Sequence, residues 1–491
     1  MDNKPATIAA NSKLLFEPRS VAFLGASSDP TKWGFRILAN LIYGGFQGKI
    51  YPVNPKGGEI LGLEVYRSVG DIPETPDLGV IVVPPPRVSD VVKECVNKGI
   101  KAGVVITAGF AEIGEEGERL QQEIVEIGRK GGMILVGPNS FGVVNPWNKL
   151  YSQMPPIFPP PGPVGIVSQS GNVVGTISRL AIANGLGCSK CISSGNEADL
   201  KSQDYLEYLA DDPNTKVILC YIEGFKDGSR FFHIAKEVTK KKPVVMLKAG
   251  ETPAGARAVK SHTASLAGTD AVFDAMCRQA GVIRVRSLDE LVATGTALLC
   301  HPVPRGGRVG IVTAGGGWGA LAADACAKLG LDVVSLPPET LAELDSFLPA
   351  WWNRGNPVDL VAGAFGDALT KCVEVLLRCP TVDAVIMLGL MPGVSGQLFT
   401  QSFSEQEREQ SRELLLTRIG NIFDRLNELV NAHQKPVVVA SEPPAFGSGS
   451  ADKVTRTIAE RNSVCYHMPH QAASALASLV QYGKYLSQDS G

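Results

Sequence analysis

The chain has 491 residues, of which 44% are hydrophobic and 20% are charged, and its formal net charge is −2. This length exceeds what one hydrophobic core can serve, so we expect about two to four domains. The near-zero charge argues against a nucleic-acid partner, no apolar run reaches the ~18 residues of a membrane span, and residues 1–11 lack the apolar core of a signal peptide. We therefore expect a cytoplasmic protein with no nucleic-acid or membrane partner.

The first part of the chain alternates apolar strands with amphipathic helices. Residues 20–26 predict a buried strand that runs into a glycine turn, followed by a small polar loop and a helix over 35–41. This alternation predicts a parallel sheet covered on both faces. The opening is typical of a Rossmann-like unit, but the G-x-G-x-x-G fingerprint of dinucleotide binding is absent. Further strands are expected at 49–53, 78–83, 102–107 and 133–136, and helices at 88–98 and 115–129.

The predicted strands end in segments suited to binding a ligand. Ligands of parallel α/β sheets bind at the carboxyl ends of the strands. Here all five ends carry glycine or proline, several of which allow a ligand to approach closely, and Lys32 and Lys56 could meet phosphates. An ordinary strand-ending turn explains any one segment about equally well, whereas all five together favour a nucleotide-like ligand. The segments are 25–27, 52–56, 83–85, 107–110 and 137–140.

A second α/β series follows a proline-rich stretch. Six prolines among residues 155–163 predict an extended linker and a domain boundary. Cys188 and Cys191 form a lone C-x-x-C pair, which is weak evidence for zinc or redox chemistry. We expect both in or beside a buried strand. Further strands are expected near 187–192, 217–222 and 243–248. At the carboxyl edge of this sheet we expect Ser168, Ser170, Asn196, Glu197, Glu223 and His262.

His262, one of six histidines, lies in the stretch Lys260-Ser-His-Thr-Ala-Ser-Leu-Ala-Gly268. The Ala/Leu/Gly run after it could open a helix. A histidine at a helix start lies where backbone N–H groups bind anions, which suits the carrying of a phosphoryl group. The alternative is a helix N-cap, Ser261 or Thr263, beside an exposed histidine. Glu223 could orient the imidazole, or it could be a partly buried acid in a salt bridge.

A third α/β series closes the chain. A helix over 285–299 is expected to close the second series, and a Pro/Gly linker over 302–307 precedes the third, which opens at 308–319. The glycine loop at 315–319 lacks the Gly-Lys-Ser/Thr of a P-loop, so we interpret it mainly as a turn at a sheet edge. The other expected elements are a helix at 320–329, strands at 384–388 and 436–440, and a long exposed helix at 405–433.

A series of short motifs extends over nearly the whole chain, from Leu14 to Leu486. They are Gly25-Ala-Ser27, Trp33-Gly34, Pro52-Val-Asn-Pro-Lys56, Thr107-Ala-Gly-Phe-Ala-Glu112, Gly137-Pro-Asn-Ser140, Ser168-Gln-Ser-Gly171, Gly195-Asn-Glu-Ala-Asp199, Glu223-Gly224 and Ser261-His-Thr263 through Gly268. Each is weak alone, but their order and spacing are highly specific. The chain resembles the α subunit of the NDP-forming acyl-CoA synthetases, the ADP-forming acetate–CoA ligase branch of the succinyl-CoA synthetase superfamily.

The resemblance implies an α/β fold with three open parallel-sheet domains. These are a Rossmann-like CoA-binding domain at 1–150, a flavodoxin-like domain at 163–300 with the phosphohistidine loop, and a second flavodoxin-like, ligase-CoA domain at 306–491. His262 is the implied phosphoryl carrier, and Glu223 is the implied catalytic carboxylate that holds its imidazole. The implied phosphate-binding residues are Ser168, Gln169, Ser170 and Gly171. The implied CoA-binding residues are Gly25, Ser27, Lys32, Val53, Asn54, Pro55, Lys56, Pro84, Thr107 and Asn139.

The implied reaction reversibly converts an acyl-CoA, ADP and phosphate into the free acid, CoA and ATP, through an acyl phosphate and a phosphohistidine. The three predicted domains leave no room for the family's ATP-grasp module. A separate ATP-grasp β subunit is therefore implied, in an α2β2 assembly, holding most of the ADP/ATP and Mg²⁺. Ala264 replaces the family's usual glycine and could stiffen the loop. The identity of the acid, ADP versus GDP, and the physiological direction stay open.

Two other functions fit parts of the sequence. One is a CoA- or acyl-CoA-binding regulatory protein of the same fold without ligase activity; such a protein has no need of a histidine at position 262. The other is an NAD-dependent oxidoreductase, suggested by the N-terminal unit alone and disfavoured by the absent glycine fingerprint.

Overall fold

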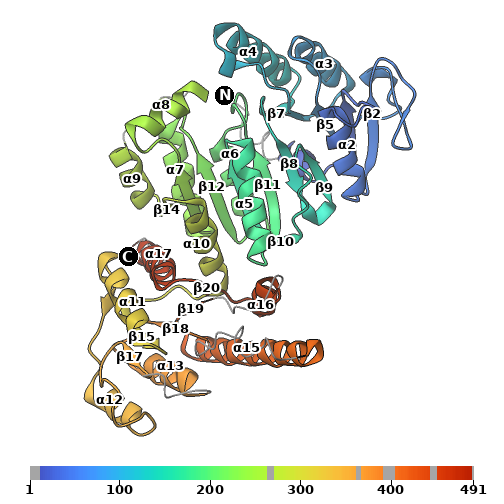
Figure 1. Cartoon of the computed structure of the whole chain (residues 1–491). Coiled ribbons are helices and arrows are strands. Elements are labelled where there is room, and N and C mark those ends of the chain that lie inside the picture. The colour runs from blue at the N-terminus through green and yellow to red at the C-terminus, as the bar shows by residue number, and fades with distance from the viewer. Residues whose placement is uncertain (1–10, 263–269, 361–366, 391–403, 443–449, 489–491) are drawn as a thin grey trace. The chain divides into compact units, whose positions relative to one another are not determined.

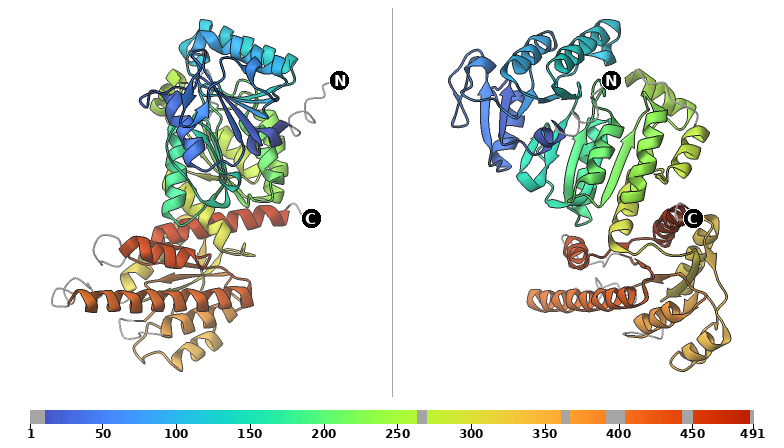
Figure 2. Two further views of the ribbon diagram at one scale, coloured as in Figure 1. Left: turned by 90° about the vertical axis from the view of Figure 1, so that its right-hand side faces the viewer. Right: turned by 180° about the vertical axis from the view of Figure 1, so that it is seen from behind.

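The computed structural model describes residues 11–262, 270–360, 367–390, 404–442 and 450–488. The chain forms two compact units, one made of Met1–Ile182 and Gly187–Arg286 and the other of Ala183–Leu186 and Ser287–Gly491. The sheets in both units are open and mainly parallel, with helices packed against them (Figures 1 and 2), so the predicted α/β class is confirmed. No helix in the described ranges is long and apolar enough to span a membrane.

The N-terminal sheet has five parallel strands in the order β2-β1-β5-β6-β7. Its central strand β1 (Ser20–Leu24) is buried throughout. Val21 and Phe23 share an apolar cluster with α2, whereas Ala22 and Leu24 share another with α3 and α4. Both faces are therefore covered, which explains the unbroken apolar run. The other elements are β2 (Lys49–Val53), β3 (Glu59–Ile60), β4 (Leu63–Glu64), β5 (Leu78–Ile81), β6 (Ala102–Val105), β7 (Ile134–Val136), α2 (Trp33–Tyr43), α3 (Pro85–Lys98) and α4 (Glu115–Lys130).

The second sheet of this unit has seven strands in the order β14-β13-β12-β10-β11-β8-β9. The prolines at 155–163 do not form a simple linker, because β10 (Pro161–Ser168) begins among them. Strands β8 (Gly142–Asn145) and β9 (Leu150–Gln153) precede the prolines, yet β8 pairs antiparallel with β11 in the same sheet as β10. The remaining elements are β11 (Cys188–Ser193), β12 (Val217–Ile222), β13 (Val244–Lys248), β14 (Ile283–Val285), α5 (Gly171–Ala183), α6 (Ser202–Asp211), α7 (Gly228–Lys241), α8 (Pro253–His262) and α9 (Asp270–Gln279).

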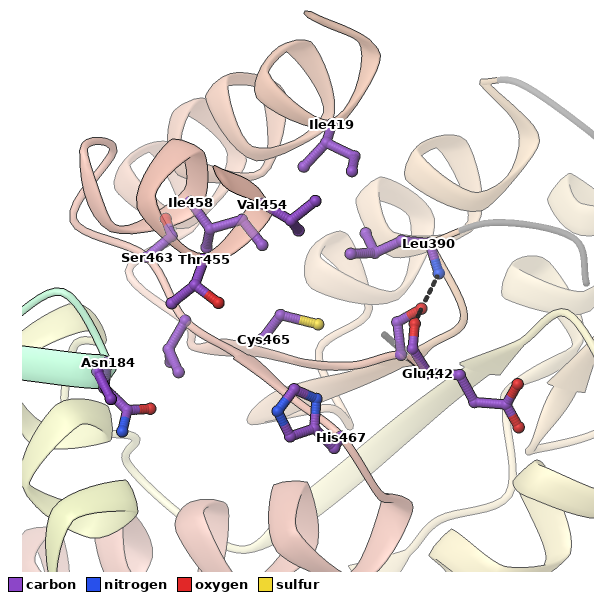
Figure 3. Close-up of a pocket in the computed structure, with 13 residues that line it drawn as sticks. Asn184, Leu390, Ile419, Glu442, Val454, Thr455, Ile458, Ser463, Cys465 and His467 are labelled. Carbon is purple, nitrogen blue, oxygen red and sulfur yellow. Dashed lines mark hydrogen bonds between the residues drawn. The ribbon is translucent and has the colours of Figure 1, made fainter. Parts of the chain in front are cut away.

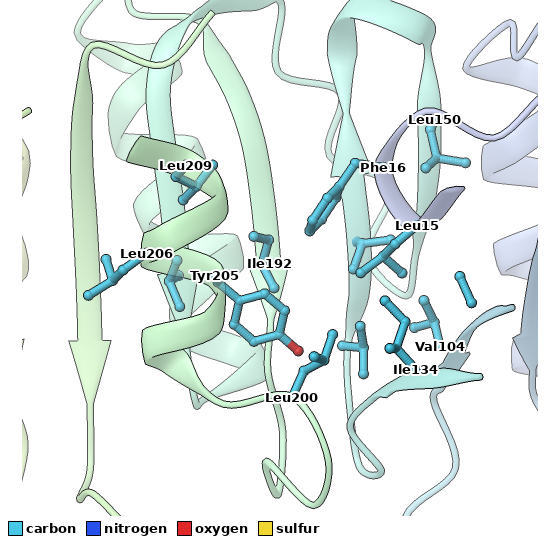
Figure 4. Packing of buried hydrophobic residues seen from close by; sticks show 14 of the residues in the cluster. Leu15, Phe16, Val104, Ile134, Leu150, Ile192, Leu200, Tyr205, Leu206 and Leu209 are labelled. Atoms are coloured by element: carbon cyan, nitrogen blue, oxygen red, sulfur yellow. The ribbon is translucent and has the colours of Figure 1, made fainter. Parts of the chain in front are cut away.

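One apolar cluster joins the two sheets of the first unit. Figure 4 shows Leu15 and Phe16 from the short helix at 11–16 beside side chains of both sheets, including Ile134 of β7 and Ile192 of β11. The Phe16 ring also stacks on Tyr208 of α6, with 4.6 Å between centroids. Because they share this core, the two sheets pack as one body.

The second unit has a parallel sheet in the order β16-β15-β18-β19-β20, with β17 also paired to β15. The predicted long helix is confirmed as α15, which opens with a capping box between Ser404 and Glu407. The strands are β15 (Arg308–Thr313), β16 (Asp332–Val333), β17 (Val358–Asp359), β18 (Ala384–Leu388), β19 (Val437–Ala440) and β20 (Cys465–Tyr466). The helices are α10 (Leu288–Cys300), α11 (Gly316–Lys328), α12 (Pro338–Asp345), α13 (Ala368–Arg378), α15 (Glu405–His433), α16 (Ser450–Ala459) and α17 (Pro469–Gln488).

Two helix boundaries differ from the sequence-based expectation. The helix expected at 320–329 already begins at Gly316, so the glycine loop forms its first turn. The helix expected over 285–299 begins later, because Val285 ends β14 and Ser287 caps α10 by accepting the Glu290 N–H at 3.1 Å. Helix α10 is also grouped with the second unit. The three domain boundaries stay a prediction. Cys188 and Cys191 lie buried and free in β11, as predicted.

Candidate active site

A cavity of about 1060 Å³ opens at the carboxyl ends of β1, β2, β5 and β6. All the CoA-binding residues implied by the family resemblance line it except Lys56, which is exposed in the turn after β2. Pockets of about 300–1,000 Å³ hold drug-sized ligands. This cavity can therefore hold a ligand of nucleotide size or larger.

The turn between β1 and α2 forms one wall of the cavity. Gly25 has a φ of +96°, and a Cβ there would lie 2.4 Å from the Val82 carbonyl oxygen. A Cβ on Gly34, in the first turn of α2, would lie 2.1 Å from the Gly25 carbonyl oxygen. Both positions require glycine. The half-exposed Trp33 ring lies beside them, 5.2 Å from the Arg36 guanidinium.

Polar side chains tie the strand ends around the cavity together. Asn54 Nδ2 donates to the Ala26 carbonyl at 2.8 Å, and its Oδ1 accepts the Lys56 N–H at 2.9 Å. Thr107 Oγ1 donates to the Val83 carbonyl at 2.6 Å. The bonds to the Ala26 and Val83 carbonyls join turns that follow different strands, so they fix the shape of the cavity rim.

Sequence patterns did not predict several residues of the cavity. Arg67 follows β4 and Arg87 lies in the first turn of α3, so neither belongs to the strand ends from which the prediction was made. Arginines are preferred ligands of phosphate groups. Arg87 lies just after the predicted segment 83–85, which was the available signal, whereas Arg67 lies well beyond segment 52–56. Phe141 and Met154, which supply apolar lining, carried no such signal.

The turn between β10 and α5 contains the four predicted phosphate-binding residues. The buried Ser168 donates from Oγ to the Ser170 carbonyl at 2.7 Å and accepts the Ser170 N–H at 3.2 Å. Helix α5 begins at Gly171, where a Cβ would lie 2.1 Å from the Phe141 ring. Phe141, which lines the cavity, therefore packs directly against a helix start of the kind that binds anions.

The Gln169 side chain holds the backbone that follows β12. Its Oε1 accepts the N–H groups of Glu223 at 2.6 Å and of Gly224 at 3.1 Å, and its Nε2 donates to the Gly224 carbonyl at 2.9 Å. The Gln169 N–H donates to the Tyr221 carbonyl at 3.1 Å. Gln169 was expected to bind phosphate; in the structure these groups are engaged within the protein. They fix the backbone of Glu223, the predicted partner of His262.

The Glu197 side chain lies next to that of Gln169. It is buried, with a φ of +52°, and its carboxylate accepts hydrogen bonds from Ser194 Oγ at 2.8 Å and from Ser202 Oγ. Burial raises the pKa of Glu197 above its ordinary value, and the hydrogen bonds oppose that shift, including one with Gln169. Glu197 therefore supports the same side chain that holds Glu223.

Asn196 connects the two sheets of the first unit. Its Oδ1 accepts from Asn139 Nδ2 at 3.3 Å, and its Nδ2 donates to the Glu112 carboxylate, which also accepts the Gly109 N–H at 2.6 Å. Asn139 lines the cavity, and Asn196 follows β11. Hydrogen bonds thus link the predicted CoA-binding turn at Asn139 to the turn that follows β11.

Helix α8 covers Pro253–His262, so His262 follows helical residues. Pro253 opens this helix, and the alanine-containing segment after it is helical. The helix that the Ala/Leu/Gly run after His262 was expected to open falls on residues 263–269, so that expectation stays a prediction. The side chains of 260–262 and the whole of 263–269 lie outside the described residues. Helix α8 follows β13, and Glu223 follows β12. Because β12 and β13 pair in parallel, Glu223 and the segment that carries His262 both follow the carboxyl ends of neighbouring strands, at the same edge of the sheet.

The turn between β15 and α11 repeats the hydrogen bonding of the β10–α5 turn. Thr313 Oγ1 donates to the Gly315 carbonyl at 2.8 Å and accepts the Gly315 N–H at 3.2 Å. Ala314 N–H donates to the Leu388 carbonyl on the neighbouring strand at 3.1 Å. The two turns share geometry although their sequences differ.

A second pocket, of about 210 Å³, lies in the second unit at the carboxyl ends of β18, β19 and β20 (Figure 3). Its apolar lining includes Leu390, Ile419 and Val454. The Leu390 N–H donates to Ser441 Oγ at 3.2 Å. Burial raises the pKa of Cys465 to about 12, which keeps this lining thiol protonated. None of the predicted site residues lines this pocket.

Three family models match the chain in succession. They describe a CoA binding domain over residues 19–146, a succinyl-CoA ligase like flavodoxin domain over 161–298 and a ligase-CoA domain over 309–399. Most of the residues that line the large cavity belong to the segment matched by the CoA binding domain. The β10–α5 turn and Glu223 belong to the segment matched by the succinyl-CoA ligase like flavodoxin domain. Fold, site and matches together define the class as multidomain α/β proteins of the succinyl-CoA ligase type.

Full-length relatives narrow this class. The chain is 40% identical over 471 residues to the α subunit of acetate–CoA ligase (ADP-forming) II of Pyrococcus furiosus, and the match covers 96% of this chain and 97% of that protein. It is 39% identical to the α subunit of acetate–CoA ligase (ADP-forming) I of the same organism, with the same coverage. The chain belongs to the family of ADP-forming acetate–CoA ligase α subunits.

A solved structure agrees with this assignment. The dinucleotide forming acetyl-coenzyme A synthetase 1 of Ca. Korarchaeum cryptofilum, in complex with phosphate and ADP, is 32% identical and superposes with a TM-score of 0.83. The superposition covers 98% of this chain and 99% of that chain.

Proposed function

We propose that this chain is the catalytic α subunit of an ADP-forming acid–CoA ligase. The reaction converts an acyl-CoA, ADP and phosphate reversibly into the free acid, CoA and ATP. The observation that carries the proposal is the junction at Phe141, where a cavity large enough for CoA meets the helix start of α5. An acyl thioester held in the cavity and a phosphate held at the helix start would then be neighbours.

In the proposed first step, a phosphate oxygen attacks the thioester carbonyl. The carbon–sulfur bond breaks, the phosphate proton passes to the departing thiolate, and acyl phosphate and CoA result. Ser168, Ser170 and Gly171 bind the phosphate through the helix start, whose positive end stabilises the negative charge. Gln169 supports this step indirectly by holding the Glu223 backbone.

In the second step, a nitrogen of His262 attacks the phosphorus of the acyl phosphate. The bond between phosphorus and the acyl oxygen breaks, and the carboxylate leaves. The Glu223 carboxylate holds the other imidazole nitrogen and stabilises its positive charge. In the third step, an oxygen of the ADP β-phosphate takes the phosphoryl group from the histidine and forms ATP. A covalent relay divides one transfer into easier ones.

The nucleotide is assigned to a partner. The P. furiosus relatives are named as α subunits, and we assign ADP and Mg²⁺ mostly to an ATP-grasp β subunit in an α2β2 assembly. Among the residues that the structure describes, no group of three or more His, Cys, Asp or Glu side chains could hold a metal ion. Residues 1–150 are assigned to CoA, 163–300 to phosphoryl transfer, and 306–491 to the ligase-CoA domain.

The test is the intact mass of the full chain after incubation with phosphate and a panel of acyl-CoAs, with and without the ATP-grasp partner. We expect a gain of one phosphoryl group, removed by ADP. The gain should be absent in His262→Asn and present in His233→Asn, an exposed histidine of α7 that serves as the matched control. The acyl-CoA that gives the fastest gain identifies the acid.

Two results would overturn the proposal. A mass gain that persists in His262→Asn would move the carrier to another residue. No gain with any acyl-CoA in the partnered complex, while CoA still binds, would make the protein a CoA-binding regulator.

A further inference from the structure

Two arginines of β14 and its C-terminal end share three carboxylates. We call Arg284, Arg286, Glu251, Asp270 and Asp274 the Arg284 cluster. Arg284 Nη2 lies 2.8 Å from Glu251 Oε1, and the same guanidinium binds the carboxylates of Asp270 and Asp274. Arg286 Nη1 lies 2.9 Å from Glu251 Oε1 and 3.6 Å from Asp270 Oδ2. The cluster therefore contains two cations and three anions.

Arg284 is the central member of this cluster. Its side chain is 6% exposed, whereas that of Arg286 is 52% exposed. Its Cζ lies 5.0 Å from the centroid of the buried Phe273 ring. The hydrogen bond from Arg284 is the main cause that lowers the pKa of Asp270. Charge-assisted bonds in a buried site are strong, and removing one partner there is far more disruptive than at an exposed pair.

The carboxylates lie on both sides of the histidine in sequence. Glu251 lies between β13 and α8, and Asp270 is the first residue of α9. His262 lies between them. One buried guanidinium therefore binds both ends of segment 252–269, the segment that carries His262.

We propose that Arg284 is a positioning residue for phosphoryl transfer, acting by holding Glu251 and Asp270 together and so fixing the two ends of segment 252–269. This inference rests on the proposed role of His262 as phosphoryl carrier. A tethered group reacts at an effective concentration set by how its tether is held. Loss of Arg284 leaves three neighbouring carboxylates with the exposed Arg286 and with Lys248 of β13, which interacts with Asp270 and Glu251. Repulsion among the carboxylates is then less compensated and separates the ends of the segment.

The test compares Arg284→Leu with Arg284→Lys, and with Arg286→Leu as the matched control on the same carboxylates. Rapid-quench assays on the full chain measure phosphohistidine formation from acyl-CoA and phosphate, together with the KM for acyl-CoA. Hydrogen–deuterium exchange of peptides covering 252–270 reports directly on the segment and does not depend on activity.

Arg284→Leu should slow phosphohistidine formation about 10²-fold, the loss typical of a misplacement of about 1 Å, with the KM for acyl-CoA within about twofold. Exchange should rise in peptides covering 252–270 and stay unchanged in those lining the CoA cavity. Arg284→Lys should recover part of the rate, because it keeps the charge but loses the fork that binds two carboxylates. Arg286→Leu should stay within about threefold of the wild-type rate.

Two outcomes would overturn the inference. One is an Arg284→Leu variant with wild-type exchange in 252–270, whatever its rate. The other is exchange that rises throughout the first unit together with the KM, which would make Arg284 a residue of general stability. A wild-type chain that forms no phosphohistidine would overturn the proposed function instead, and the exchange comparison still decides whether Arg284 holds the segment.

Discussion

Replacing Gln169 by alanine should both destabilise the first unit and slow phosphoryl transfer. The side chain makes three hydrogen bonds to the Glu223–Gly224 backbone. Each contributes about 0.5–1.5 kcal/mol net, and buried donors left without an acceptor add to the loss. We therefore expect Gln169→Ala to lower the free energy of unfolding by about 2–4 kcal/mol. Each 1.4 kcal/mol of lost positioning at Glu223 slows the transfer about tenfold.

Chemical denaturation followed by circular dichroism measures the first effect, and rapid-quench phosphohistidine formation measures the second. Gln47→Ala is the matched control, because Gln47 is exposed and its side chain donates to the Gly45 carbonyl in the same turn. The control should leave both quantities unchanged.

The result that would refute this reasoning is specific. If Gln169 acts as a phosphate ligand, Gln169→Ala should raise the KM for phosphate and leave the free energy of unfolding at the wild-type value. That pattern would mean that the hydrogen bonds to Glu223 and Gly224 contribute nothing measurable.

Three further predictions follow from single contacts. Asp212→Asn should lower the free energy of unfolding by about 3–5 kcal/mol, because it leaves the fully buried Lys190 ammonium, which lies 3.2 Å from Asp212, without its anionic partner. A loss under about 1 kcal/mol in urea denaturation would contradict this. Gly34→Ala should weaken CoA binding in calorimetry at least about tenfold, because its Cβ would meet the Gly25 carbonyl at 2.1 Å; unchanged affinity would refute it. Burial raises the pKa of Glu197 above its ordinary value of 4.5. The free energy of unfolding of the wild type should therefore fall as the pH rises from 4.5 through the raised pKa. Glu197→Gln should lack that fall, and parallel curves of unfolding free energy against pH would disprove the assignment.

The sequence predicted the sheets well where the signal is local. Strands 217–222 and 384–388 match the observed bounds, because apolar runs buried on both faces end at glycines, prolines and polar turns. Strand 49–53 also matches, although it lies at the edge of its sheet and begins with the exposed Lys49. The cavity residues followed from the same pattern, since the carboxyl ends of parallel strands meet at one edge. Gly25 and Thr107 are examples, and both line the cavity.

Other features depend on contacts between distant residues. Strands β8 and β9 join a sheet whose other members come after the proline-rich stretch, and local periodicity does not reveal such a pairing. The hydrogen bonds of the Gln169 side chain were not predicted, because its partners follow β12, more than 50 residues further along the chain. The helix before His262 was not predicted, although the helix propensity of residues 253–262 supports it.

By itself the sequence determined the α/β class, the order of the elements and the turns that carry the chemistry, because each is encoded by neighbouring residues. Only the tertiary structure decided which of those turns meet. It brings Phe141 against Gly171, Gln169 under Glu223, and Arg284 between Glu251 and Asp270. These pairs depend on strand order and register, which arise from packing the whole chain and leave no short-range signature.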